Sequence, residues 1–303
     1  MSVHAETVIQ WLEAFAPKHL AVEGDKIGLQ IGTLNKRVKK VLVTLDVTEE
    51  VVEEAIHNQV DLIIAHHAVI FKPLANLRTD IPLGRMIANL LTHDIAVYVA
   101  HTNLDITMGG VNDWLAERLG LVETEVLSVT HQEKLKKLVT FVPLAHEQAV
   151  RQALGDAGAG WIGNYSHCTF RVEGTGTFLP QENTNPYIGE KGKLEEVQEV
   201  RMETIFPEQI ERKVLQALFK AHPYEEVAYD IYPLDNQGAS YGLGRIGRLP
   251  QKLSLKEFVE LVKQAFDVPR CRVVGDLERK VEKVAIVGGD GNKYMHAALF
   301  KGA

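Results

Sequence analysis

Three short apolar runs follow one another in the first third of the chain. They are rich in β-branched residues and cover Val41–Thr48, Val60–His66 and Ile95–His101. Continuous apolar runs of this length are typical of strands that are buried on both faces of a parallel sheet. The segments between them have helical periodicity, so helices are expected to connect the strands. The pattern therefore predicts an α/β fold.

The connecting segments and the N-terminus have the spacing of amphipathic helices. Thr48 stands at the N-cap position of the first connecting segment, and acidic residues follow it in the first turn. The expected inward stripes are Val51, Val52, Ala55 and Ile56 in that segment, Met86, Ile87, Leu90 and Leu91 in the next, and Ile9, Leu12 and Phe15 at the N-terminus.

A different pattern begins near Val126 and continues to about Asp235. It contains a weak duplication, because LVTFVP precedes EQAVRQAL (138–154) and METIFP precedes EQIERKVLQAL (202–218). With strand-like stretches at 167–178 and 226–232, the segment predicts a βαβ-βαβ order, which is that of an inserted α+β ferredoxin-like domain. A polar, glycine-containing loop is expected at 181–193.

The remaining residues predict a return to the α/β pattern. DNQGASYGLGRIG (235–247) predicts a linker, 254–266 a helix, and 284–300 a strand, turn and helix. The glycines at 288–291 indicate either a tight turn or, less simply, a phosphate cradle. A further strand is expected beyond Ala303. We predict a two-part α/β core with parallel-rich sheets (1–130 and 236–303, the second half incomplete) around an insert (131–235).

Composition restricts the class of protein. With 46% hydrophobic residues in 303 positions the chain can bury a large core, and no segment predicts a membrane span or a signal peptide, so a cytoplasmic location is expected. The net charge of −7 and the lack of a basic run make nucleic acid an unexpected partner. Cys168 and Cys271 have no metal-ligand spacing and are expected to be reduced packing residues.

Polar residues gather where the predicted strands end. His66 and His67 follow the second strand, and Asp105 lies shortly after the third. Ligands bind beyond the carboxyl ends of strands in open α/β sheets, and imidazole with carboxylate suits zinc, iron or manganese. We therefore predict a divalent metal site with His66, His67 and Asp105 as ligands. Because adjacent strand residues point to opposite faces, the two histidines serve one centre only if the chain turns there.

Three other polar residues at the same sheet edge have two interpretations each. Asp46 could orient a metal ligand as a hydrogen-bond acceptor or cap the following helix. His101 and Asn103 could take part in the site or hold the loop in shape.

Several motifs resemble the GTP cyclohydrolase 1 type 2 homologs, also called NGG-interacting-factor-like proteins. The resemblance covers nearly the whole chain and is carried by DKIGLQIG (25–32), AHHAVIF (65–71), AHTNLD (100–105), GGVNDWLAERLGL (109–121) and AHPYEEVAYDIYPL (221–234). It implies two α/β halves around a dinuclear metal centre, a homohexameric ring in complete members, and an inserted domain in many bacterial ones. His66, His67 and Asp105 are metal ligands by that resemblance. Ala68 stands where many members have proline, and a late His/Glu ligand pair is expected only beyond Ala303.

Two functions are compatible with these features. The first is a metal-dependent hydrolase acting on a nucleotide or related small molecule, in which the metal lowers the pKa of a coordinated water to about 7. The second is a non-catalytic protein that binds, delivers or senses metal, with the insert as a ligand-binding or assembly module. No general base can be assigned from the sequence.

Overall fold

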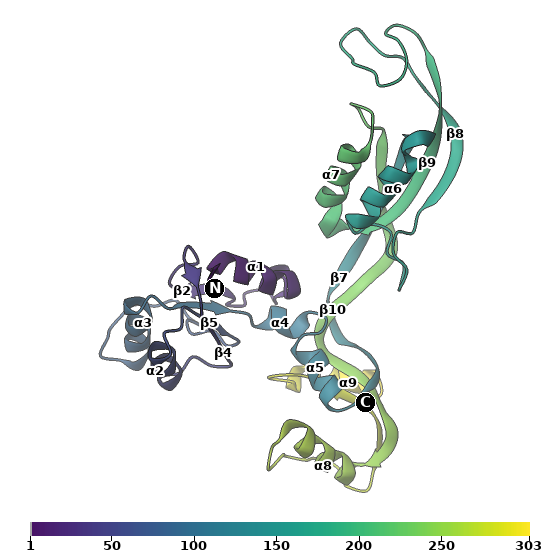
Figure 1. Cartoon of the computed structure of the whole chain (residues 1–303). Helices are drawn as coiled ribbons and strands as arrows, with labels where there is room; N and C mark the ends of the chain where they lie inside the picture. The colour runs from purple at the N-terminus through teal and green to yellow at the C-terminus, as the bar shows by residue number, and fades with distance from the viewer. Residues whose placement is uncertain (1) are drawn as a thin grey trace. The chain divides into compact units, whose positions relative to one another are not determined.

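The structure is a computed structural model that describes residues 2–303, and these residues separate into two compact units (Figure 1). The first unit combines the chain up to His131 with Tyr241–Ala303, and the second is Gln132–Ser240. The long strands β7 (Val122–Pro143) and β10 (Tyr229–Ser254) each contribute residues to both units. The predicted mixture of helices and strands is confirmed, with a four-stranded mixed parallel sheet, a five-stranded antiparallel sheet and a two-stranded antiparallel sheet.

The mixed sheet of the first unit contains the three predicted strands. They are β4 (Val41–Thr44), β5 (Leu62–Ala65) and β6 (Ala96–Val99), and they pair in parallel in the order β6-β5-β4. Strand β2 (Gly28–Ile31) joins β6 in the antiparallel direction. The apolar runs therefore identify the parallel part of the sheet correctly.

Both faces of β5 and β6 are covered, as continuous apolar strands require, but Val41 and Val43 leave one face of β4 exposed, so the double burial expected for that strand is wrong. On one face of the sheet, helices α2 (Glu49–His57) and α3 (Pro82–Thr92) form a core with alternate strand residues. On the other face, α1 (Ala5–Phe15) packs against the intervening strand residues. Ile63 and Val97 belong to the first core, whereas Leu62, Ala96 and Tyr98 belong to the second.

Most of the predicted helix features are present. The Thr48 side chain accepts a hydrogen bond from the Val51 amide and so caps α2. Ile9, Ile87 and Leu90 are buried as predicted. The inward positions assigned to Phe15 and Leu91 are wrong, because both are about half exposed. Phe15 is the last residue of α1, and its ring lies against the turn at Gly109.

Short elements complete the first part of the chain. They are β1 (Val3–His4), β3 (Arg37–Val38), a 3₁₀ turn at Lys18–Leu20, α4 (Thr102–Ile106) and α5 (Val111–Arg118).

The C-terminal part of the first unit contains α8 (Leu255–Phe266), β11 (Lys280–Ile286), a 3₁₀ turn (Asn292–Tyr294) and α9 (Met295–Phe300). Strand β11 pairs with β10 in the antiparallel direction. The prediction of parallel-rich sheets is therefore wrong for this half. The helix expected at 254–266 is present, with a reciprocal capping box between Ser254 and Glu257.

The predicted linker at 235–247 is also wrong, because these residues belong to strand β10. Its glycines allow close approach of backbones rather than a turn. A Cβ at Gly242 would lie 2.0 Å from the Ser128 carbonyl oxygen on β7, and one at Gly247 would lie 2.8 Å from that of Val122. Glycine within a strand marks such close contacts as readily as it marks a loop.

The glycines at 288–291 form a turn after β11. The Gly288 amide donates to the Asn112 side chain, and Gly289 has φ +71°. These observations favour the tight-turn interpretation of the segment over a phosphate cradle.

The second unit has the element order that the duplication predicts. Its helices are α6 (Glu147–Asp156) and α7 (Glu211–Ala221), and its strands include β8 (Phe170–Phe178) and β9 (Glu195–Pro207). Strand β9 pairs antiparallel with β7 and with β8, in the sheet order β10-β7-β9-β8. The two helices pack on one face around Leu138, Met202 and Leu218.

Among residues 2–303, no helix combines the length and the apolar character that crossing a membrane requires.

Candidate metal centre

The parallel strands β5 and β6 place three histidines at one edge of the sheet. The register sets Ala65 beside Val99, so the residues that follow each strand begin side by side. His66 and His67 come directly after β5, and His101 comes shortly after β6 as the residue before α4. The edge is the one at which open α/β sheets hold their ligands.

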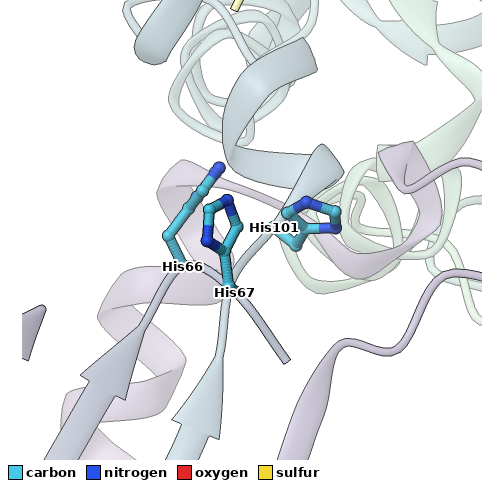
Figure 2. Close-up of side chains that lie close together, drawn as sticks. All are labelled: His66, His67 and His101. Atoms are coloured by element: carbon cyan, nitrogen blue, oxygen red, sulfur yellow. The ribbon is translucent and has the colours of Figure 1, made fainter. Parts of the chain in front are cut away.

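The three imidazoles face a common point (Figure 2). Each offers one nitrogen, and these nitrogens lie within 4.8 Å of one another. Ring centroids are 5.2 Å apart for His66 and His67, 5.0 Å for His66 and His101, and 5.7 Å for His67 and His101. The chain bends at the histidine doublet, which removes the strand alternation and lets both side chains serve one centre.

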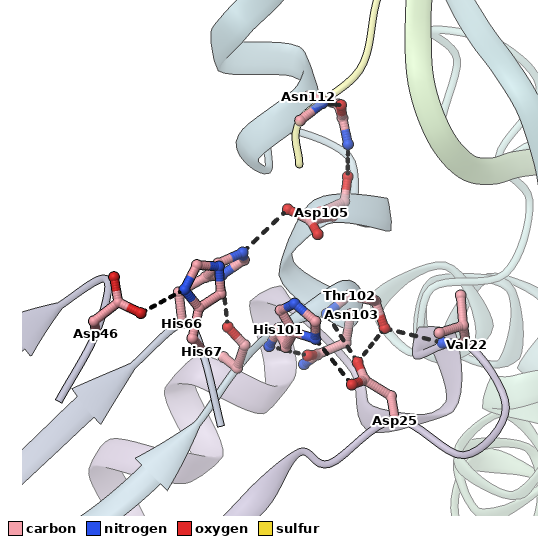
Figure 3. A network of polar contacts seen from close by, with 12 residues as sticks. Val22, Asp25, Asp46, His66, His67, His101, Thr102, Asn103, Asp105 and Asn112 are labelled. Atoms are coloured by element: carbon pink, nitrogen blue, oxygen red, sulfur yellow. Dashed lines mark hydrogen bonds and ion pairs between the residues drawn. The ribbon is translucent and has the colours of Figure 1, made fainter. Parts of the chain in front are cut away.

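Hydrogen bonds hold the Nδ1 atom of every one of these rings. The acceptors are the Ala100 carbonyl oxygen for His66 at 3.0 Å, and Asp46 Oδ1 for His67 at 2.7 Å (Figure 3). His101 Nδ1 donates to Asp25 Oδ1 at 2.8 Å. Because Nδ1 carries the proton in each case, Nε2 has the free lone pair that a metal ion requires. The orienting role considered for Asp46 is therefore the one its geometry supports, since Thr48 caps the helix.

Asp25 is itself fixed by the start of α4. Its Oδ2 accepts from the Thr102 amide at 3.1 Å and from the Thr102 hydroxyl. Burial raises the pKa of the Asp25 carboxyl, but hydrogen bonds from Thr102 and His101 outweigh burial and keep the pKa below its usual value. The carboxylate thus stays ionised and orients the His101 ring.

Asp105 lies next to the histidines on α4. Its carboxylate is mostly buried, and Oδ1 is 3.6 Å from His66 Nε2 (Figure 3). Burial raises the pKa of Asp105 and lowers the pKa of His66. A lowered pKa favours the neutral imidazole, which is the form that coordinates a metal ion.

Two buried asparagines fix the backbone around this cluster. Asn103 accepts from the His101 amide and donates to the Ala16 carbonyl oxygen, so it holds the loop in shape. Asn112 on α5 donates to the Asp105 carbonyl oxygen and accepts from the Gly288 amide, both at 2.9 Å. The helix that carries Asp105 is thereby tied to the turn after β11.

Of the residues predicted as ligands, His66 and His67 lie in the trihistidine cluster, and Asp105 lies beside it. The structure adds His101 to the cluster. From the sequence, His101 had two interpretations, as part of the site or as a residue that holds the loop in shape. No individual role was predicted for Asp25 or Asn112, although both belong to motifs that carry the family resemblance. Asp25 precedes strand β2, whose pairing with β6 brings it near His101, and its place in the motif DKIGLQIG was the signal available in the sequence.

The fold and the cluster together define an α/β protein with a candidate histidine metal site at the end of a parallel sheet. The family model Duf34/NIF3 (NGG1p interacting factor 3) matches residues 3–303, and the chain belongs to this family.

Similar proteins agree with this assignment. The chain is 58% identical over 302 residues to the GTP cyclohydrolase 1 type 2 homolog of Bacillus subtilis, covering 100% of this chain and 81% of the relative. The homolog of Halalkalibacterium halodurans is 58% identical over 300 residues, covering 99% and 81%. A crystal structure of a Bacillus cereus protein related to NIF3 has a TM-score of 0.92 at 58% identity, covering 99% and 80% of the two chains. The Staphylococcus aureus protein SA1388 has a TM-score of 0.73 at 30% identity, covering 99% and 79%.

Proposed function

We propose that this protein binds a divalent transition metal through the Nε2 atoms of His66, His67 and His101, with Asp105 as a further ligand. The observation that carries the proposal is the set of hydrogen bonds to Nδ1 of all three rings, which leaves Nε2 of each ring available to a metal, in a cluster where one nitrogen of each ring lies within 4.8 Å of the others. A purely structural histidine cluster has no need for this uniform orientation. Zinc, iron and manganese all accept such a donor set.

We further propose that the bound metal serves hydrolysis of a nucleotide or a related small molecule. The ion would supply Lewis acidity, which favours attack by water near neutral pH. In this proposal Asp25, Asp46 and the Ala100 carbonyl oxygen hold the ligand imidazoles in the rotation and tautomer that leave Nε2 available to the metal. Support for the substrate class comes from the relatives described as GTP cyclohydrolase 1 type 2 homologs.

Metal binding is tested by titration of the metal-free protein with Zn²⁺ or Mn²⁺ under calorimetric detection. The proposal expects one or more ions per chain and a large loss of affinity in the His67→Ala variant. His93→Ala is the matched control, because His93 is exposed directly after α3 and its ring bonds to the Asn89 carbonyl oxygen of that helix. Equal metal affinity in the wild type and the His67→Ala variant would show that this histidine cluster is not the metal site.

Catalysis is tested separately by incubating the metal-loaded protein with GTP and following product formation by chromatography. Turnover that disappears in the His67→Ala variant would support the hydrolase. Stoichiometric metal binding without turnover of nucleotides would favour the alternative, a protein that binds, delivers or senses metal.

Two further features belong to the proposed function, namely the assembly of the protein and the folding of the insert. We propose a homohexameric ring and a ferredoxin-like insert that folds independently within 131–235. The insert is supported by the sheet order β10-β7-β9-β8 with both helices on one face.

A further inference from the structure

The second unit contains a cavity of about 400 Å³ that is remote in sequence from the histidine cluster. Its walls come from β7, β8, β9, the segment after α7 and the loop at 179–188. Pockets of this size accommodate small organic ligands. The AHPYEEVAYDIYPL motif, which has no part in the metal site, supplies Tyr224, Glu225, Glu226 and Ala228 to this wall.

A buried carboxylate forms part of the cavity wall. Glu199 on β9 is 8% exposed, and its Oε1 accepts a hydrogen bond from the Tyr224 hydroxyl at 2.8 Å. A Cβ at position 176 on the neighbouring strand would lie 2.1 Å from Glu199 Oε2. Glycine at this position therefore leaves the space that the carboxylate occupies, and the cavity is built around the acid.

Aromatic rings gather around Tyr224, the hydrogen-bond partner of this carboxylate. The Tyr224 ring lies 6.0 Å from Phe178, 6.4 Å from Tyr187 and 5.0 Å from His222, measured between centroids. Phe141 also lines the cavity. Aromatic faces attract cations within about 6 Å, most strongly where water is excluded.

The charges of the wall have one sign. Its ionisable acids are Glu199, Glu225 and Glu226, and none of the described residues that line the cavity is lysine or arginine. His222 is held neutral, because it donates to the Phe141 carbonyl oxygen and accepts from the Tyr224 amide, and burial lowers its pKa. A buried carboxylate normally has a cationic partner, and the wall provides none.

We propose that this cavity binds a compact organic cation, such as a substituted ammonium group on an apolar body. The ammonium group faces Glu199, and the aromatic rings of Phe178, Tyr187 and Tyr224 cover its apolar surface. Glu225 anchors the covering loop, since its carboxylate accepts from the Asn185 amide at 2.7 Å.

The test uses the full chain and benzyltrimethylammonium as the probe, with binding measured by calorimetry at low salt. The neutral comparison is 2,2-dimethyl-1-phenylpropan-1-ol, which has a similar size and no charge. We expect the cation to bind once per chain with a dissociation constant of about 1 mM or below, and at least about tenfold more tightly than the neutral molecule.

Two variants and one control variant locate the site. Glu199→Gln keeps an acceptor for Tyr224 and removes the charge, so it should abolish the preference for the cation. Glu196→Gln removes the same charge from an exposed position on the same strand and should change nothing. Tyr187→Leu alters a mostly exposed loop residue, so the fold should persist while cation affinity falls several-fold. Equal affinity for the two molecules, no binding of the cation, or unchanged binding in Glu199→Gln would each overturn the proposal.

Discussion

His101 and Asp25 are joined by a hydrogen bond of 2.8 Å between Nδ1 and Oδ1, although 76 residues separate them in the sequence. The bond fixes both the tautomer and the rotation of the imidazole, and Thr102 fixes the carboxylate from the other side. Removing such an orienting acceptor weakens metal binding about tenfold to a hundredfold in known sites.

Asp25→Asn should therefore lower the affinity for Zn²⁺ by about tenfold to a hundredfold without unfolding the protein. The amide keeps the shape of the side chain, but it presents an NH₂ group either to the His101 ring or to the Thr102 amide, both of which are donors. Metal titration by calorimetry measures the change. Asp94→Asn is the control, because Asp94 is exposed and asparagine tolerates its positive φ of 53°. Equal losses in both variants would contradict the orienting role.

His101→Ala distinguishes a metal ligand from a residue that only shapes the loop. If His101 is a ligand, its removal should lower the affinity for Zn²⁺ by more than about a hundredfold. This loss should exceed the loss caused by removing its partner Asp25. A loop-shaping residue should instead lower the thermal midpoint of the metal-free protein and leave affinity nearly unchanged. Measuring both quantities in one preparation separates the two outcomes.

Local patterns predicted the part of the site that the strands themselves create. Apolar runs that end in polar residues identify where β5 and β6 finish, and the family motifs point to His66, His67 and Asp105. The orienting residues were harder to predict, because Asp25 reaches His101 only through the antiparallel pairing of β2 with β6. No local pattern encodes such a pairing.

The wrong predictions about the fold have a similar origin. Glycines at 235–247 fit both a linker and a strand that another backbone approaches closely, and only the neighbouring β7 residues decide between them. The direction of β11 depends on how α8 and the following loop return to β10, which is a tertiary property. The outward position of Phe15 likewise follows from where α1 ends, and helix ends are poorly encoded by periodicity.

Asn112→Ala should destabilise the first unit by about 1–3 kcal/mol, because it leaves the Gly288 amide and the Asp105 carbonyl oxygen without their buried partner. Denaturant unfolding measures the loss. The exposed Asn35 offers a comparison, and Asn35→Ala should stay close to wild type. An Asn112→Ala variant with unchanged stability would show that these hydrogen bonds do not tie α4 to the turn after β11.

Gly242→Ala should also destabilise the protein, by about 1–3 kcal/mol, because the added Cβ would overlap the Ser128 carbonyl oxygen on β7. Gly174→Ala provides the control, since nothing lies within 4 Å of a Cβ at that strand position. Thermal unfolding of the two variants decides the matter. A Gly242→Ala protein as stable as the wild type would mean that β7 and β10 do not approach each other closely at this position. That result would agree with the linker prediction for 235–247.

Protonation of His222 should weaken the second unit as the pH falls. Burial holds the pKa of the folded imidazole below the ordinary value of 6.5, so the unfolded chain binds more protons between the two values. The contribution of neutral His222 is therefore fully present above about pH 6.5 and is lost as the pH falls through the folded pKa. In His222→Gln, the amide can donate to the Phe141 carbonyl oxygen and accept from the Tyr224 amide, as the imidazole does, but it does not titrate. Denaturant unfolding at pH 7.5 and pH 5 should show a smaller difference in stability for this variant than for the wild type or for His93→Gln at an exposed site. Identical differences in all three proteins would place the acid sensitivity elsewhere.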